Sequence, residues 1–203
     1  MKKLLALSVF GAVLMSGCSS FKAERVDDAR ADTEAMGITD TWVGGDTVRV
    51  IEGSMKQIYA HKGFNEYYSG MNGKRIKLFV GEIRNNTPEA NLPMADIQDA
   101  LLEKVSNSDQ FKLIDAEKRQ ALLKEITYQN DGMVDPLQAK KVGKQSGADA
   151  MIFGEINMKQ DTRGGKSIKY YSVNLRLTDI QSSEEICRTR EEIKKYSKGN
   201  GSW

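Results

Sequence analysis

The sequence has little of the side-chain chemistry that catalysis and metal binding require. Its 203 residues include one histidine, two cysteines and three prolines. A single histidine excludes a zinc-protease helix, which needs two, and no base accompanies Cys187 as a cysteine hydrolase would require. His61, near the end of an expected helix, is then a surface or capping residue. We expect no catalytic residue, no metal, no cofactor and no small-molecule substrate.

One glycine-containing run looks like the end of a phosphate-binding loop. It reads Arg163-Gly164-Gly165-Lys166-Ser167. The pattern needs a glycine five positions before Gly165, where Gln160 stands, and a strand-to-helix context that is missing here. A flexible hairpin loop over 161–166 is the expectation. Aspartate and glutamate are plentiful, but nothing singles out an acid/base pair.

The sequence also carries little net charge, a formal +2 over the whole chain. Lysine and arginine number 30 against 28 aspartates and glutamates, and losing Lys2 and Lys3 with a leader leaves 28 of each. A balanced chain gives no electrostatic reason to expect nucleic acid, or anionic lipid bound through a basic patch.

No apolar run is long enough to cross a bilayer. The run Leu4–Leu14 holds eleven residues, whereas a spanning helix needs about 20. Two lysines precede it, and Leu14-Met15-Ser16-Gly17-Cys18 follows, a pattern that resembles the lipobox of bacterial lipoproteins. The N-terminus therefore predicts a signal peptide over residues 1–17 and attachment of lipid, including acyl chains such as palmitate, to Cys18.

The residues around the two cysteines refine this prediction. Ser19 stands where aspartate, by resemblance to enteric sorting rules, would hold a lipoprotein at the inner membrane. We therefore expect an outer-membrane anchor and a domain facing the periplasm. With Cys18 acylated, Cys187 has no intramolecular partner and is expected to be a buried, inert thiol. A Cys18–Cys187 disulfide is the rival interpretation, which requires a leader of another type.

Composition and periodicity divide the mature chain into a tether and one domain. Residues 18–40 are polar and predict a lipidated, flexible N-terminus, whose ~22 residues after Cys18 would reach roughly 70–75 Å when extended. A domain is expected over 41–198. Its expected elements are a helix over 46–61 with Asp46 as N-cap, a loop over 62–73, a strand over 75–84, a helix starting at Pro93, a strand over 111–114, helices after Asp115 and from Asp135 to Gly147, and strands over 148–156, 171–177 and from Glu185.

The strand patterns indicate where each strand lies. Segments 75–84 and 148–156 are apolar on both faces, as is typical of strands inside a covered sheet. Segment 171–177 alternates and buries one face only. The last strand is rich in charge through Lys195, which protects a sheet edge. We therefore predict a single α/β domain with a mixed β-sheet flanked by helices.

Several segments between Ile76 and Ile186 carry a family resemblance. They are Phe79–Thr87, Leu101–Asp115, Ala139–Gly143, Gly147–Ile156, Leu175–Ile180 and Glu185-Ile186. Together they resemble the C-terminal domain of the LpoB family, outer-membrane lipoproteins that activate bifunctional, class A penicillin-binding proteins in peptidoglycan synthesis. The tether departs from this family by being shorter and poor in proline.

The resemblance implies a non-enzymatic protein whose partner is a penicillin-binding protein. Within it, the turn after the first strand offers Asn85, Asn86 and Thr87 as candidate partner-binding residues. The same outline is similar to the TolB N-terminal domain and to CsgG. The alternative function is therefore a structural or secretion-associated lipoprotein that acts through oligomerisation.

We expect protein isolated from cells to begin at Cys18 and to carry a diacylglycerol thioether on that sulfur. Small residues before the cysteine let the backbone enter a tight protease site, and the thiol is the acceptor atom. Mass spectrometry of the N-terminal peptide checks this, with the peptide containing Cys187 as the unmodified internal control. An unmodified thiol at position 18, or an intact leader, would contradict the prediction.

Overall fold

The computed structural model describes residues 25–114 and 147–199. The described helices are α1 (Asp28–Ile38), α2 (Gly44–Ala60), α3 (Lys62–Gly70) and α4 (Met94–Ser106), and the strands are β1 (Ile76–Asn85), β2 (Phe111–Leu113), β3 (Ala150–Arg163), β4 (Lys166–Asp179) and β5 (Glu185–Lys198). The two helices expected after Asp115 and Asp135 lie outside the described residues. Gly147, expected to end the second of them, has the positive φ of 67° that such an end requires.

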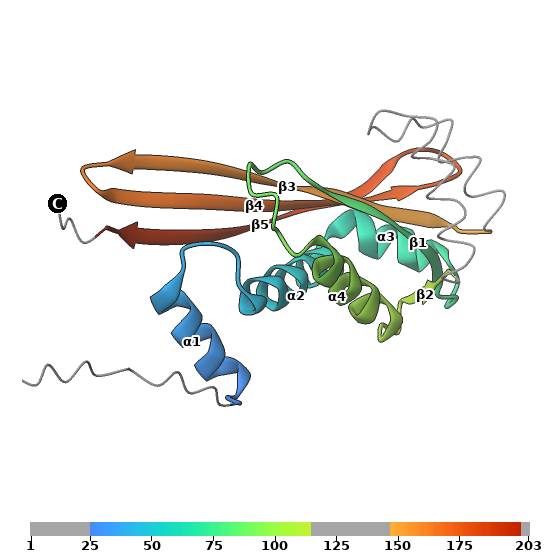
Figure 1. Ribbon diagram of the computed structural model, residues 1–203. Coiled ribbons are helices and arrows are strands. Elements are labelled where there is room, and N and C mark those ends of the chain that lie inside the picture. Colours follow the sequence, from blue (N-terminus) through green and yellow to red (C-terminus); the bar gives the residue numbers. More distant parts are fainter. Residues whose placement is uncertain (1–24, 115–146, 200–203) are drawn as a thin grey trace, which may run out of the picture.

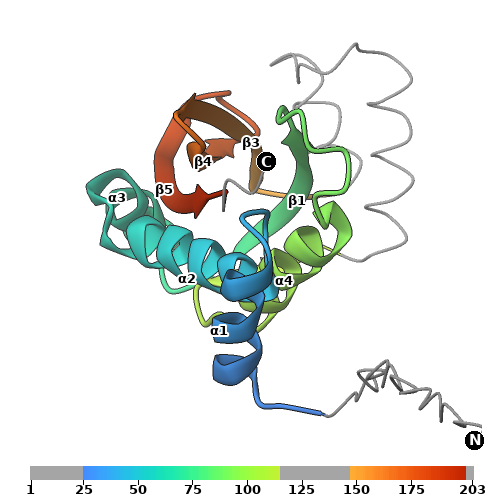
Figure 2. The same cartoon turned by 60° about the vertical axis from the view of Figure 1, so that its left-hand side comes forward.

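The strands form one mixed sheet in the order β2-β1-β3-β4-β5. β1 is parallel to both β2 and β3, whereas β3, β4 and β5 are antiparallel. The sheet curls around α2 and α4, and its last three strands continue far beyond these helices as a ribbon (Figures 1 and 2). This arrangement confirms the predicted α/β class, the interior positions of β1 and β3, and β5 as an edge strand.

The core lies between the inner face of the sheet and the helices. On β4 the side chains of Tyr171, Val173, Leu175 and Leu177 are buried, as the alternation predicted. They belong to the same cluster as apolar side chains of α2 and α4, among them Ile51, Ile58, Ile97 and Leu101. Burial of each large side chain of this kind stabilises the fold by about 1.5–3 kcal/mol.

The expected helix starts are each shifted. The first residue of α2 is Gly44, and Asp46 is its third residue rather than its N-cap, with its carboxylate accepting from the N–H of Val43 at 2.9 Å. That bond satisfies one of the donors left free at a helix start. Pro93 likewise precedes α4 as its N-cap instead of being its first residue.

Residues 62–70, expected to be a loop because of their glycines, form helix α3 instead. His61 ends α2 and begins α3, and its Nδ1 accepts from the N–H of Gly63 at 3.1 Å, which confirms its capping role. Phe64 is buried. Glycine is needed at position 63 because α3 packs closely against β5: a Cβ there would lie 2.3 Å from the carbonyl oxygen of Ile186 on β5.

The expectation of a flexible tether through residue 40 is wrong over residues 28–38, which form α1. This helix buries none of its side chains, and its order comes from local bonds. Asp27 accepts from the N–H of Arg30 at 2.9 Å, and Asp32 accepts from the N–H of Gly45 at 3.0 Å. The second bond attaches α1 to the start of α2.

The hairpin expected over 161–166 is confirmed, but its loop is shorter than expected. Pairing between β3 and β4 continues to Arg163 and Lys166, and only Gly164 and Gly165 form the turn. Both have positive φ, 55° and 72°, the geometry of the two-residue turn that suits a twisted hairpin.

The edge of β5 is covered at one point by a side chain. The amide of Gln57 on α2 donates from Nε2 to the carbonyl of Arg190 and accepts at Oε1 from the Arg190 N–H, each at 3.0 Å. The amide thus makes the two bonds that a neighbouring strand would make.

We expect Gly63→Ala to lower the free energy of unfolding by about 1–3 kcal/mol, because the added methyl group forces α3 away from β5. Gly70→Ala, in the same helix with nothing within 4 Å of a Cβ, is the matched control and should change stability by no more than about 1 kcal/mol. Urea unfolding of both variants measures the difference. Equal effects would show that the close approach at Gly63 is not what limits that position.

Candidate partner-binding surface

The loop after β1 is positioned by a β-bulge. The register of β1 against β3 shifts between Val80 and Ile83, and the side chain of Gln98 binds the Gly81 carbonyl there at 2.9 Å. A bulge moves the following residues to the opposite faces. Arg84 therefore pairs with Glu155 on the outer face, and Asn85 pairs with the buried Ile156 on the inner face.

Asn85 and Thr87 shape this loop from within. The Oδ1 of Asn85 accepts from the N–H of Thr87 at 2.9 Å and from its hydroxyl at 2.7 Å. The Nδ2 of Asn85 donates to the carbonyl of Glu89 at 2.8 Å. Both side chains are half-buried, so their amide and hydroxyl groups are committed to the loop itself, as in Asx turns.

Asn86 differs from its two neighbours because its side chain is exposed. Its backbone N–H donates to the Ile156 carbonyl at 2.8 Å, and its Nδ2 donates to Glu155 at 3.1 Å. The structure therefore brings the three predicted residues together, with Asn86 outermost. Their binding of a partner stays a prediction.

A cluster of charged side chains that the sequence pattern did not predict lies beneath this loop. Glu89 accepts at one oxygen from the Nζ of Lys169 at 2.8 Å and at the other from the hydroxyl of Tyr171 at 2.7 Å. Lys169 also donates to Asp40 at 2.9 Å, and Asp40 accepts from the Ser197 hydroxyl at 2.6 Å. We call these five residues the Lys169 cluster.

The Lys169 cluster fixes the protonation of its members. The Ser197 hydroxyl and the Lys169 ammonium lower the pKa of the Asp40 carboxyl. Burial alone would lower the pKa of Lys169, but its bonds to Glu89 and Asp40 outweigh burial and raise it. Burial and the Glu89 carboxylate raise the pKa of Tyr171. These pKa shifts favour the carboxylate form of Asp40, the ammonium form of Lys169 and the protonated phenol of Tyr171.

Aromatic and ionic contacts extend the cluster toward α2. The ring of Trp42 packs edge-on against Tyr171 with centroids 5.6 Å apart, and its Nε1 donates to Thr47 at 2.8 Å. Lys195 on β5 forms an ion pair with Asp46. One signal was available in the sequence: Lys169 continues the alternation of Tyr171 and Val173, which puts its side chain on the buried face of the strand.

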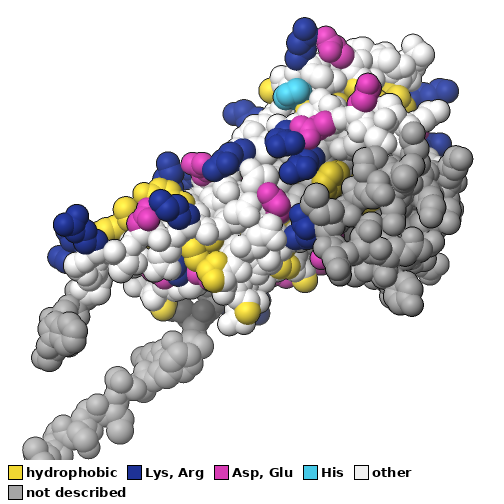
Figure 3. Space-filling model, turned by 90° about the horizontal axis from the view of Figure 1, so that it is seen from above, with side chains coloured by type: hydrophobic (Ala, Val, Ile, Leu, Met, Phe, Trp, Pro, Cys, Tyr) yellow, Lys and Arg dark blue, Asp and Glu magenta, His cyan; other side chains and the backbone are white. Residues whose placement is uncertain are grey.

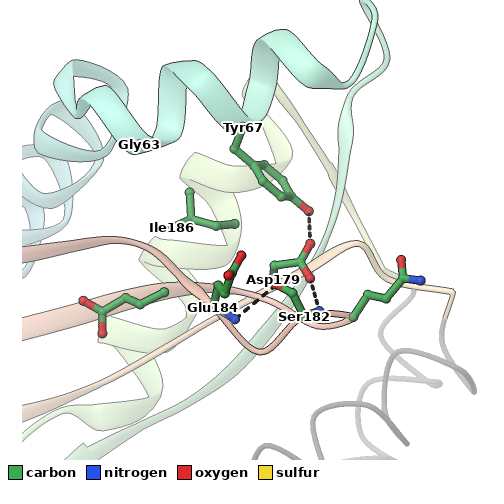
Figure 4. A pocket seen from close by; sticks show the side chains of 8 residues that line it. Gly63, Tyr67, Asp179, Ser182, Glu184 and Ile186 are labelled. Atoms are coloured by element: carbon green, nitrogen blue, oxygen red, sulfur yellow. Dashed lines mark hydrogen bonds between the residues drawn. The ribbon is translucent and has the colours of Figure 1, made fainter.

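A separate hollow of about 490 Å³ lies between α3 and the β4–β5 turn (Figure 4). The hydroxyl of Tyr67 donates to Asp179 at 2.8 Å, and Asp179 also accepts from the Ser182 N–H. Glu184 and Glu185 add negative charge to its wall, and Glu185 is paired with Arg188 at 2.8 Å. These contacts hold the turn against α3.

The residues with reactive side chains occupy structural positions. Cys187 is 3% exposed, which confirms its predicted burial, and burial raises the pKa of its thiol to about 12. The described residues contain no group of three histidine, cysteine or acidic side chains that could hold a metal ion. Of the described helices, none has the length and apolar character needed to span a membrane.

These features define the class of the protein as an α/β domain that presents a shaped loop and a curled sheet to its surroundings. The family model described as the peptidoglycan-synthase activator LpoB matches residues 46–193. Because this is well over half of the 203 residues, the chain belongs to the LpoB family, which confirms the resemblance read from the sequence.

Solved structures give weaker similarity. The LpoB C-terminal domain from Salmonella enterica is 15% identical with a TM-score of 0.47, and the match covers 70% of this chain and 97% of that one. The LpoB C-terminal domain from Escherichia coli is 16% identical with a TM-score of 0.44 (63% and 93% covered), and lipoprotein GNA1162 from Neisseria meningitidis is 18% identical with a TM-score of 0.42 (62% and 88% covered). No curated protein matches the chain by sequence.

We expect the stability contributed by Asp40 to disappear at low pH. The pKa of Asp40 lies below its ordinary 3.8 in the folded protein, so folding favours the charged form. This contribution is complete above the ordinary value and is lost as the pH falls through the lowered one. The difference in unfolding free energy between the wild type and Asp40→Asn should therefore stay constant between about pH 7 and 5 and shrink below about pH 4.

Urea unfolding over this pH series measures the difference. Asp99→Asn is the control, because Asp99 is exposed on α4 and forms no hydrogen bond or ion pair with another described residue. A wild-type to Asp40→Asn difference that is flat down to the lowest pH would contradict the role assigned to the Lys169 cluster.

Proposed function

We propose that this protein is a non-enzymatic lipoprotein that binds and activates a bifunctional, class A penicillin-binding protein in peptidoglycan synthesis. The observation that carries the proposal is the match of residues 46–193 to the family of peptidoglycan-synthase activators. The structural roles of His61 and Cys187 support it, since both side chains are occupied in holding the fold. Activation then comes from binding alone.

The proposed anchor is the acylated Cys18 in the outer membrane, with the domain facing the periplasm. The ten residues 18–27 can span at most about 35 Å. Helix α1 adds eleven residues and so about 16 Å. These lengths keep the domain within roughly 50 Å of its membrane, which is shorter than a fully extended tether through residue 40 would allow. The synthase must therefore come within that distance.

The proposed docking element is the loop of residues 85–92, with Asn86 at its surface. The Lys169 cluster and the Asn85 turn hold its shape, so little conformational freedom is lost when a partner binds. A bound activator can shift the synthase only by preferring its active conformation. A rigid loop is suited to such discrimination because it fits one conformation better than another.

We expect the mature chain to retain a purified class A synthase in a pull-down and to raise its rate of glycan polymerisation. Asn86→Arg should weaken retention at least about tenfold, because a bulky cation replaces the outermost amide. Asn107→Arg, an exposed position after α4, is the matched control. A mature chain that neither binds a synthase from its own host nor changes the polymerisation rate would refute the proposed function.

A further inference from the structure

The free end of the β3–β4–β5 ribbon sorts its side chains into rows. On β4 the residues with odd numbers from 169 to 177 face the core, so residues with even numbers face outward. Direct register partners share a face. The outermost row is Arg163, Lys166 and Lys198, one cation from each strand, directly opposite one another.

The next two rows mix aromatic, aliphatic and basic side chains. Moving inward from the tip, one row is Asp161, Ile168 and Tyr196, and the following row is Lys159, Tyr170 and Lys194. Tyr196 is 59% exposed and Tyr170 is 36% exposed. Large hydrophobic side chains on a solvent face are informative when they gather in this way.

The cations of the outermost row lack a counter-charge in the described chain. Lys159 pairs with Asp161 at 3.2 Å, and Lys194 lies 3.7 Å from Glu192. No acidic side chain among residues 25–114 and 147–199 lies within 4.0 Å of the basic groups of Arg163, Lys166 or Lys198. Like charges placed directly opposite on neighbouring strands destabilise a sheet, so an external anion would relieve this arrangement.

The chain is balanced in charge overall, yet these three rows hold five cations and a single carboxylate. Figure 3 shows the outer face of the ribbon, where lysine and arginine side chains flank hydrophobic ones toward the free end. All five cations are exposed. The fold has therefore collected a basic and aromatic patch that the net charge of the sequence conceals.

The composition of this patch favours a lipid surface over a protein. Four of its five cations are lysine, and lysine is depleted from protein interfaces while arginine is enriched. Lysine combined with tyrosine is typical of surfaces that lie on a membrane, where the phenol rests among headgroups and the ammonium meets phosphate. Ile168 adds apolar contact between the basic rows.

The ribbon tip and α1 lie toward the same end of the molecule. In Figure 1 both are at the left, with α1 on the helix side of the sheet and the patch on its outer face. Nine residues, 19–27, separate α1 from Cys18. The inferred closeness of the patch to a membrane depends on the proposed anchor at Cys18, whereas the existence of the patch does not.

We propose that the outer face of the ribbon tip, formed by the three rows from Arg163 to Lys194, binds an anionic phospholipid surface. Such binding lays the domain against a membrane and orients the rest of its surface toward the periplasm. Phosphate groups supply a counter-charge for the cations of the outermost row. Each basic residue near an anionic bilayer contributes about 1 kcal/mol.

The test uses the mature chain with Cys18→Ser, so that no acyl chain contributes to binding. We expect it to sediment with vesicles of phosphatidylglycerol and phosphatidylethanolamine at low salt, to dissociate as salt rises, and to ignore phosphatidylcholine vesicles. Removing three charges by Arg163→Ser, Lys166→Ser and Lys198→Ser together should lower the partition coefficient roughly 100-fold. Tyr170→Ser with Tyr196→Ser should lower it severalfold without changing the salt dependence.

The matched control removes three exposed lysines at the opposite end of the sheet, by Lys74→Ser, Lys77→Ser and Lys112→Ser. It should bind vesicles as the parent does, and thermal unfolding should show every variant folded. Absence of binding to anionic vesicles, or equal binding by the two triple variants, overturns the proposal. So does loss of synthase retention by the tip variant without any vesicle binding, which would assign the patch to an acidic protein. The vesicle assay contains no synthase, so its failure leaves the proposed function untouched.

Discussion

One buried ammonium group connects three segments of this domain that lie far apart in the sequence. Lys169 lies on β4 with its side chain only 11% exposed, between Asp40 before α2 and Glu89 in the loop after β1. A buried charge without partners costs several kcal/mol, so the lysine is stable there only while both carboxylates are in place. The entry of the chain into the domain and the shape of the proposed docking loop consequently depend on the same atom. Asp40 and Glu89 therefore share one positive counter-charge.

The spacing of apolar residues was sufficient to predict which strands lie inside the sheet, because each strand's pattern reflects which of its own faces are buried. The double apolar pattern of β1 and β3 and the alternation of β4 follow directly from which faces are covered. Helix α3 was not predicted because its glycines are typical of loops. Glycine is required at position 63 because the carbonyl of Ile186, far along the chain, leaves no room for a Cβ. Helix α1 was not predicted either, because it buries nothing and is ordered by caps. Contacts between distant residues leave little trace in local sequence.

In the candidate site, too, local sequence predicts some features, whereas contacts between distant residues determine others. The turn around Asn85 could be found from local chemistry, since an asparagine followed two residues later by threonine closes on itself. The partners of Glu89 could not, because they arrive on β4 about 80 positions later, as the Glu89–Lys169 bond shows. Charge is a further case. A balance of 28 basic and 28 acidic residues after loss of two lysines is a sum over the chain, and only strand register reveals that one end of the ribbon is basic.

The side-chain amide of Gln57 affects how copies of the protein can associate at high local concentration. Strand β5 has fourteen residues and ends the sheet, and a long bare edge invites other molecules to join it and grow into fibrils. Gln57 binds both the N–H and the carbonyl of Arg190. Near the middle of β5, these backbone groups are therefore not free to pair with another strand. Copies of the protein can then lie close together without joining into a common sheet.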